Sequence, residues 1–168
     1  NGGLEYLLNA LAYVSDDRAL YRGGFGVNPY DYKKAYIQML IVRKWFNKVS
    51  GNPLVHIVIA YNDQVKDIAV AAMYGQKCAM YFAGKYQVLY CTHLKDTDCG
   101  SMHTHIIINA VGYHSGQMIT TGYEEMAFFC DYVFPFVGIT KRAIKLTVDG
   151  SQALNCRTVF IINAPFSV

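Results

Sequence analysis

Three histidines near the middle of the chain have the types and spacing that could hold a metal ion: His93, His103 and His105. In a β-strand, residues two apart point to the same face of the sheet, so a strand here would present His103 and His105 side by side. A neutral imidazole is the commonest protein ligand for a divalent metal. With His93 as third ligand, at the end of a preceding strand, the spacing predicts a three-histidine metal site.

Three polar residues near the histidines are candidates for supporting the ligands. Asp96 and Asp98 lie in the loop between the two expected strands, where a carboxylate could accept the second ring N–H of a histidine and set its tautomer. Asn109 shares the expected strand face of His103 and His105. We therefore expect Asp96, Asp98 and Asn109 to surround the ligands.

Two other interpretations of the histidines stay open. The H-x-H pair could lie on the surface, unrelated to His93, although strands this apolar favour a buried site in which polar groups need partners. A structural zinc site could instead use Cys91 and Cys99, because thiolate is a good zinc ligand. The five cysteines contain no C-x-x-C pair, however, and that spacing is usual in closed zinc sites.

The segments around the histidines resemble motifs of a known family. T-H-L-K-D-T-D at 92–98 and M-H-T-H-I-I-I-N at 102–109 resemble the third motif of the conjugative relaxases, the mobilisation nucleases of the HUH endonuclease superfamily. L-E-Y-L-L-N-A at 4–10 resembles the tyrosine motif of that family, and V-H-I-V-I-A-Y at 55–61 resembles one of its strands. The likeness covers residues 4–139.

The resemblance implies a relaxase, a metal-dependent, site- and strand-specific DNA endonuclease and strand transferase that nicks single-stranded DNA at a plasmid origin of transfer. It implies that His93, His103 and His105 hold one divalent ion, Mg²⁺ or Mn²⁺, with Zn²⁺ as a further option. A tyrosine would attack the scissile phosphate and form a 5′-phosphotyrosine intermediate. The implied partners are single-stranded DNA, accessory relaxosome proteins and a coupling protein, with no membrane, in the bacterial cytoplasm.

Two tyrosines compete for the role of nucleophile. Tyr6 lies in the segment that resembles the tyrosine motif, close to the chain start, and we assign the role to Tyr6. Tyr13 follows seven residues later, which is about two helical turns, and therefore projects to the same side of the expected helix. The polar residues 15–17 predict that this helix ends just after Tyr13, where side chains are less well fixed.

Two other functions are alternatives to the relaxase. A rolling-circle replication initiator of the same superfamily would carry its tyrosine on a helix after the H-x-H pair, where Tyr123 and Tyr132 lie. A non-catalytic module would bind DNA or zinc without cutting.

Length and composition favour one globular domain. The 168 residues are 53% hydrophobic and 16% charged, which suits a chain with a sizeable core. No apolar run approaches the roughly 18 residues of a membrane-spanning helix. Five cysteines, an odd number, favour a reducing compartment over a disulfide scaffold. Because Asn1 is not a natural start, we interpret residues 1–168 as a single relaxase-type nuclease domain, excised or truncated from the N-terminal part of a protein.

Positive charge is concentrated in the first 60 residues, which contain seven Lys or Arg against four acidic residues, whereas the remainder has eight of each sign. A phosphate backbone could run over such a surface, although a solvated helix face explains the charge equally well. The residues predicted to contact DNA are Arg22, Lys33, Lys34, Arg43 and Lys44. Trp45, beside them, is expected in the core.

Hydrophobic periodicity predicts an α+β fold, and the resemblance implies a ferredoxin-like, mainly antiparallel sheet with helices packed on one face. The glycine-rich segment 22–26 is expected to be a loop. His56 is expected to be a core histidine, with a place near the metal site as the second option. The first expected helix begins at residue 4 and ends just after Tyr13, and the others cover residues 28–48, 64–82 and 121–138. The main expected strands cover 54–61, 85–93, 102–111, 144–148 and 158–163.

Overall fold

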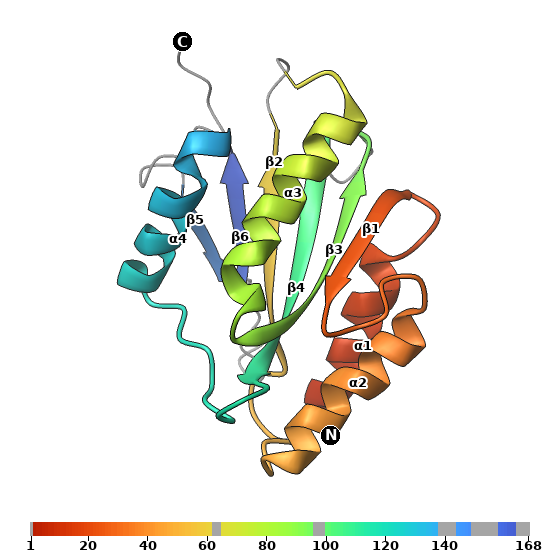
Figure 1. Cartoon of the computed structure of the whole chain (residues 1–168), viewed down its shortest axis with the longest axis vertical. Coiled ribbons are helices and arrows are strands. Elements are labelled where there is room, and N and C mark those ends of the chain that lie inside the picture. The colour runs from red at the N-terminus through yellow and green to blue at the C-terminus, as the bar shows by residue number, and fades with distance from the viewer. Residues whose placement is uncertain (1, 62–64, 96–99, 138–143, 149–157, 164–168) are drawn as a thin grey trace.

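A six-stranded β-sheet with helices on both faces makes up the fold in a computed structural model that describes residues 2–61, 65–95, 100–137, 144–148 and 158–163 (Figure 1). The helices are α1 Gly2–Val14, α2 Tyr32–Trp45, α3 Ile68–Ala83 and α4 Tyr123–Val137. The strands are β1 Ala19–Phe25, β2 Leu54–Ala60, β3 Tyr86–His93, β4 His103–Gly112, β5 Ile144–Val148 and β6 Thr158–Asn163.

The strands follow the order β1-β3-β4-β2-β6-β5, and every neighbouring pair is antiparallel except β2 and β6. Every residue of β2 and β4 is buried, which explains why their sequences read as nearly continuous apolar runs. The predicted α+β class and mainly antiparallel sheet are confirmed.

Helices cover both faces of the sheet because the central strands present apolar side chains in both directions. Ile106 and Ile108 of β4 belong to a core with α3 and α4, whereas Ile107 belongs to a second core with α1 and α2. In Figure 1, α3 and α4 lie on the near side of the sheet, and α1 and α2 lie together beside β1. The expectation that helices pack on one face was therefore wrong, since a single layer would leave half of β4 without cover.

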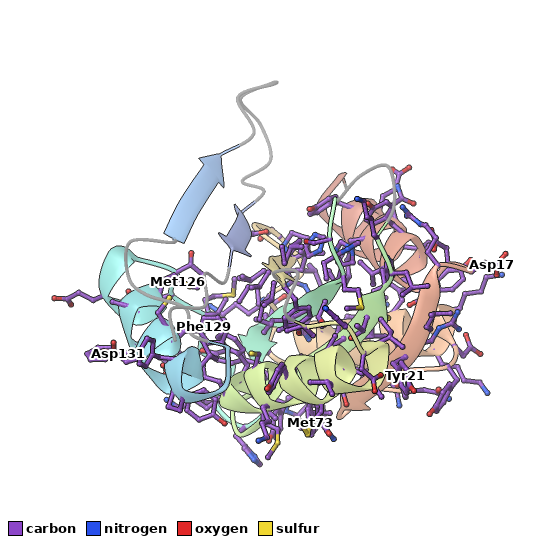
Figure 2. The ribbon with its side chains drawn as sticks, turned by 90° about the horizontal axis from the view of Figure 1, so that it is seen from above. Asp17, Tyr21, Met73, Met126, Phe129 and Asp131 are labelled. Atoms are coloured by element: carbon purple, nitrogen blue, oxygen red, sulfur yellow. The ribbon has the colours of Figure 1, made fainter. Side chains whose placement is uncertain are left out.

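Helix α4 shows how the first of these cores is closed. Its Met126 and Phe129 are buried and project toward the sheet, whereas Asp131 is exposed and projects away from it (Figure 2). The spacing of the two buried residues is three, which keeps them on one side of the helix. This helix therefore belongs to the face of the sheet opposite to α1.

Strand β1 was not predicted, because its glycines are unfavourable in strands and were interpreted as a loop. Gly23 pairs with Tyr90 of β3, and a Cβ atom at Gly23 would lie 2.1 Å from the Tyr90 ring. The missing side chain therefore gives the aromatic ring the space to lie over β1. The glycines mark a close approach within the sheet, and the strand begins beside the end of β3, where Ala19 pairs with His93.

Helix α2 is rotated relative to the sequence interpretation. Arg43 is fully buried and donates hydrogen bonds to the carbonyl oxygens of Ser50 and Pro53, whereas Trp45 is 82% exposed. The predicted DNA contact by Arg43 is therefore corrected, because its guanidinium joins α2 to the loop before β2. The predicted core position of Trp45 was likewise wrong.

Candidate metal centre and nucleophile site

The three histidines lie together where β3 ends and β4 begins, and this end of the two strands is at the top in Figure 1. His93 pairs directly with His103 across the two antiparallel strands, and His105 follows two residues along on the same face. The ring centroids are 5.2 Å apart for His93 and His103, 4.8 Å for His93 and His105, and 4.9 Å for His103 and His105. One nitrogen from each ring lies within 4.8 Å of the others.

Backbone carbonyls set the tautomers of two of these histidines. The Nε2 atom of His93 lies 3.0 Å from the carbonyl oxygen of Val14, the last residue of α1, and Nδ1 of His103 lies 2.9 Å from that of Ser101. A carbonyl oxygen only accepts, so each of these nitrogens must carry the proton and donate. The lone pairs are then on Nδ1 of His93 and Nε2 of His103.

The third histidine has a side-chain partner instead of a carbonyl. The Nδ1 atom of His105 lies 2.9 Å from Nε2 of His56, a buried residue of β2. His56 is therefore beside the predicted ligands, and the second option for it is confirmed. The sequence signal that could have found it is its place in an apolar strand, where a buried imidazole needs a partner.

In the part of the chain that the structure describes, two buried ring nitrogens have no hydrogen-bond partner: Nδ1 of His93 and Nε2 of His105. Burial lowers the pKa of both histidines, and it lowers the pKa of His56 to about 4, so all three imidazoles are neutral near pH 7. A buried polar atom without a partner is costly, and a neutral imidazole nitrogen is a metal ligand. The residues present therefore fit a divalent cation, held by His93, His103 and His105.

The end of α1 brings a tyrosine to this cluster. The Tyr13 ring packs edge-on against the His105 ring, with centroids 5.7 Å apart, and the Tyr13 side chain is 41% exposed. The guanidinium carbon of Arg18 lies 4.9 Å from the centre of the Tyr13 ring. Arg18 is held by hydrogen bonds to the Asp16 carboxylate, and these keep the pKa of Asp16 below its usual value. Three histidines that could hold a metal ion, an accessible phenol and a guanidinium thus lie together at the same end of the strands.

A comparison with family models identifies the chain's relatives. The model described as Relaxase: MobA/VirD2-like, nuclease domain, matches residues 6–132. The chain belongs to this relaxase family. The match contains all three clustered histidines and both N-terminal tyrosines, and membership implies DNA nicking in general terms. No curated protein and no solved structure matches the chain.

The two candidate tyrosines of this relaxase have different surroundings. Tyr6 is partly buried and packs against the hydrophobic core formed by α1, α2 and the sheet. Seven residues at 1.5 Å each place it about 10 Å farther from the histidines along the α1 axis than Tyr13. The structure thus brings Tyr13, and not the predicted Tyr6, into contact with a metal-ligand candidate.

The later tyrosines belong to α4. Tyr132 packs on Tyr81 of α3, with ring centroids 5.1 Å apart, and α4 covers the face of the sheet opposite to the histidines. The location of Tyr132 therefore does not support the replication-initiator alternative. The side chain of Tyr123 lies outside the described residues, although α4 begins there.

Of the three predicted supporting residues, the structure describes Asn109, which lies away from the ligands. Asn109 donates to the carbonyl oxygen of Met39 and to Oε1 of Gln87, beneath α2. It shares the histidine face of β4 but lies four residues beyond His105, about 13 Å along the strand. Asp96, Asp98 and Cys99 lie outside the described residues. Cys91 is buried opposite His105, with its Sγ atom 3.9 Å from Ser15 Oγ.

The remaining basic candidates lie at the surface or beside the site. Lys33, Lys34 and Lys44 of α2 are exposed, and Arg22 of β1 is half-buried and donates to the carbonyl oxygen of Asp16. Arg22 therefore lies next to the loop that carries Arg18. Within the described residues, no helix has the combination of length and apolar character needed to cross a membrane.

Proposed function

We propose that this relaxase domain cleaves one strand of single-stranded DNA with Tyr13 as nucleophile and a divalent cation held by His93, His103 and His105. The observation that carries the proposal is the edge contact between the rings of Tyr13 and His105. The same end of α1 also supplies the carbonyl of Val14 that orients His93. The end of α1 therefore carries the proposed nucleophile and also orients one of the proposed ligands, His93.

In the proposed reaction, the Tyr13 hydroxyl oxygen attacks the scissile phosphorus, a bond forms between them, and the phenolic proton is released to solvent. The bond from phosphorus to the 3′ oxygen breaks, the departing oxygen takes up a proton, and the 5′ end stays joined to Tyr13. The reverse reaction rejoins the strands. A bound cation would polarise the phosphate and offset charge in the transition state. The Arg18 guanidinium, which lies over the Tyr13 ring, offsets negative charge on the same oxygens.

Basic side chains near the site provide a path for the DNA backbone. Arg22 follows Arg18 on the chain and donates to the carbonyl oxygen of Asp16 in the same loop. The positive surface continues along α2 with Lys33, Lys34 and Lys44. Phosphate contacts release counterions, so this part of the proposal requires salt-dependent binding. An origin of transfer is the proposed DNA site, with relaxosome proteins and a coupling protein as proposed partners.

Covalent trapping tests the nucleophile. Single-stranded oligonucleotides of mixed sequence are incubated with Mn²⁺ and wild type, Tyr13→Phe or Tyr6→Phe, and the peptide–DNA adduct is identified by mass spectrometry. We expect Tyr13→Phe to bind metal and DNA but form no adduct, because phenylalanine lacks the attacking oxygen. Tyr6→Phe is the matched control on the same helix and should still form the adduct.

Each other outcome of this experiment has a defined meaning. An adduct on Tyr6 would restore the interpretation drawn from the sequence motif. An adduct on Tyr123 or Tyr132 would favour a replication initiator. If wild-type protein binds DNA but cleaves none of the oligonucleotides with Mn²⁺, the result would contradict the proposed nuclease activity and support a non-catalytic binding module.

A further inference from the structure

His105 differs from the other two candidate ligands in what sets its tautomer. His93 and His103 are hydrogen-bonded to backbone carbonyls, which can only accept and would be present whatever the side chain. His105 is hydrogen-bonded to another imidazole, whose Nε2 can either accept or donate. The state of His105 therefore depends on the side chain at position 56.

The sheet brings His56 to His105 through its register. Val58 of β2 pairs with His105, and His56 lies two residues before Val58, on the same face and diagonal to His105. The two rings have centroids 5.1 Å apart, and only 8% of His56 is exposed. Because β2 and β4 are hydrogen-bonded to each other, His56 has little freedom to move away from His105.

The hydrogen bond between the two imidazoles has two possible directions, with opposite consequences. If His105 donates from Nδ1, its Nε2 carries the lone pair that a metal ion needs. If His56 donates, the His105 proton must lie on Nε2, which is buried and has no hydrogen-bond acceptor among the described residues. In the first direction, a cation held between the three histidines would satisfy Nε2, whereas in the second direction it could not, because a protonated nitrogen has no lone pair to offer.

We propose that His56 is a positioning residue that accepts the Nδ1–H of His105 and thereby presents His105 Nε2 as a metal ligand. This inference rests on the proposed function of the three-histidine cluster. It assigns to an imidazole the supporting role that carboxylates were expected to play. Because His56 is a neutral acceptor, it adds no negative charge near the metal site. The positive charge of a bound cation would then remain fully available to stabilise the phosphate.

Metal affinity and the histidine tautomer together test this role. Manganese affinity is measured by calorimetry for wild type, His56→Leu and His56→Gln, with His114→Gln as control, because His114 is exposed in the turn after β4. Removing the acceptor should weaken Mn²⁺ binding about 10–100-fold, the usual effect of losing a hydrogen bond that supports a ligand. Glutamine, whose carbonyl oxygen can accept, should recover most of the affinity, and the control should match wild type.

Nitrogen-15 NMR of the histidine side chains in metal-free wild type gives a second readout that needs no substitution. The proton of His105 should lie on Nδ1, and a proton on Nε2 would overturn the proposal even if His56→Leu fails to fold. Wild-type affinity in a folded His56→Leu variant would also overturn it while leaving the metal site intact. Absence of Mn²⁺ binding by wild type, or binding that survives His103→Ala, would overturn both this inference and the metal site of the proposed function.

Discussion

Buried polar side chains lie at both ends of one face of β4, and the two ends are hydrogen-bonded in different ways. At the far end, the Asn109 amide nitrogen donates to two acceptors, the Met39 carbonyl oxygen and the Gln87 amide oxygen. At the near end, His93 and His105 each have one buried nitrogen without a hydrogen-bond partner among the described residues. The amide is saturated, whereas the imidazoles point lone pairs toward one another.

This difference separates a structural polar group from a functional one on the same strand. Folding alone gives no reason to bury an unpartnered nitrogen, since each one costs free energy. A site that holds a cation must keep such atoms available, and the cation then satisfies them. The contrast predicts that substitutions at the histidine end change metal binding and catalysis, and that substitution of Asn109 changes stability.

The largest expected effect comes from removing one ligand. His103→Ala should abolish Mn²⁺ binding and DNA cleavage, because two imidazoles cannot replace three and the developing charge on the phosphate is no longer offset. Calorimetry and oligonucleotide cleavage provide the measurements, and circular dichroism should show an unchanged fold. Unchanged affinity in the folded variant would remove His103 from the ligand set.

Metal addition should stabilise the wild-type protein. Binding to the folded state alone raises the free energy of unfolding by about 2.7 kcal/mol when free Mn²⁺ is about 100 times the dissociation constant. Urea denaturation with and without Mn²⁺ measures the gain, which should be absent in His103→Ala and retained in Asn109→Leu. Equal stabilisation of all three proteins would show that the ion binds elsewhere.

At the saturated end, Asn109→Leu keeps the side-chain shape and removes its polarity. The Met39 carbonyl and Gln87 amide oxygen lose their donor, so the free energy of unfolding should fall by about 1–3 kcal/mol. Urea denaturation of metal-free protein measures the loss, and calorimetry should give wild-type Mn²⁺ affinity. A large loss of Mn²⁺ affinity with normal stability would instead indicate that Asn109 supports the metal site.

The smallest effect is expected for His93→Leu in the metal-free protein. The substitution removes one unpartnered nitrogen and leaves one carbonyl, that of Val14, without its donor. Since one unsatisfied atom replaces another, the free energy of unfolding should change by less than about 1 kcal/mol. A destabilisation as large as that of Asn109→Leu in the same urea assay would contradict the distinction between the two ends.

Local sequence pattern by itself determined the strand faces and identified the three histidines that the structure brings together. Alternation along a strand is a property of consecutive residues, so His103, His105 and Ile107 were predicted on one face and Ile106 on the other. The pairing of His93 with His103 also required only two neighbouring antiparallel strands joined by a loop.

Only the tertiary structure distinguished the surroundings of the two tyrosines and found the partner of His105. Helical periodicity places Tyr6 and Tyr13 on the same side of α1, and their surroundings differ because α1 reaches the histidines only at its last turn. The partner of His93 lies 79 residues away in the sequence, and His56 lies 49 residues from His105. Such contacts arise from packing and strand order, which no local period encodes.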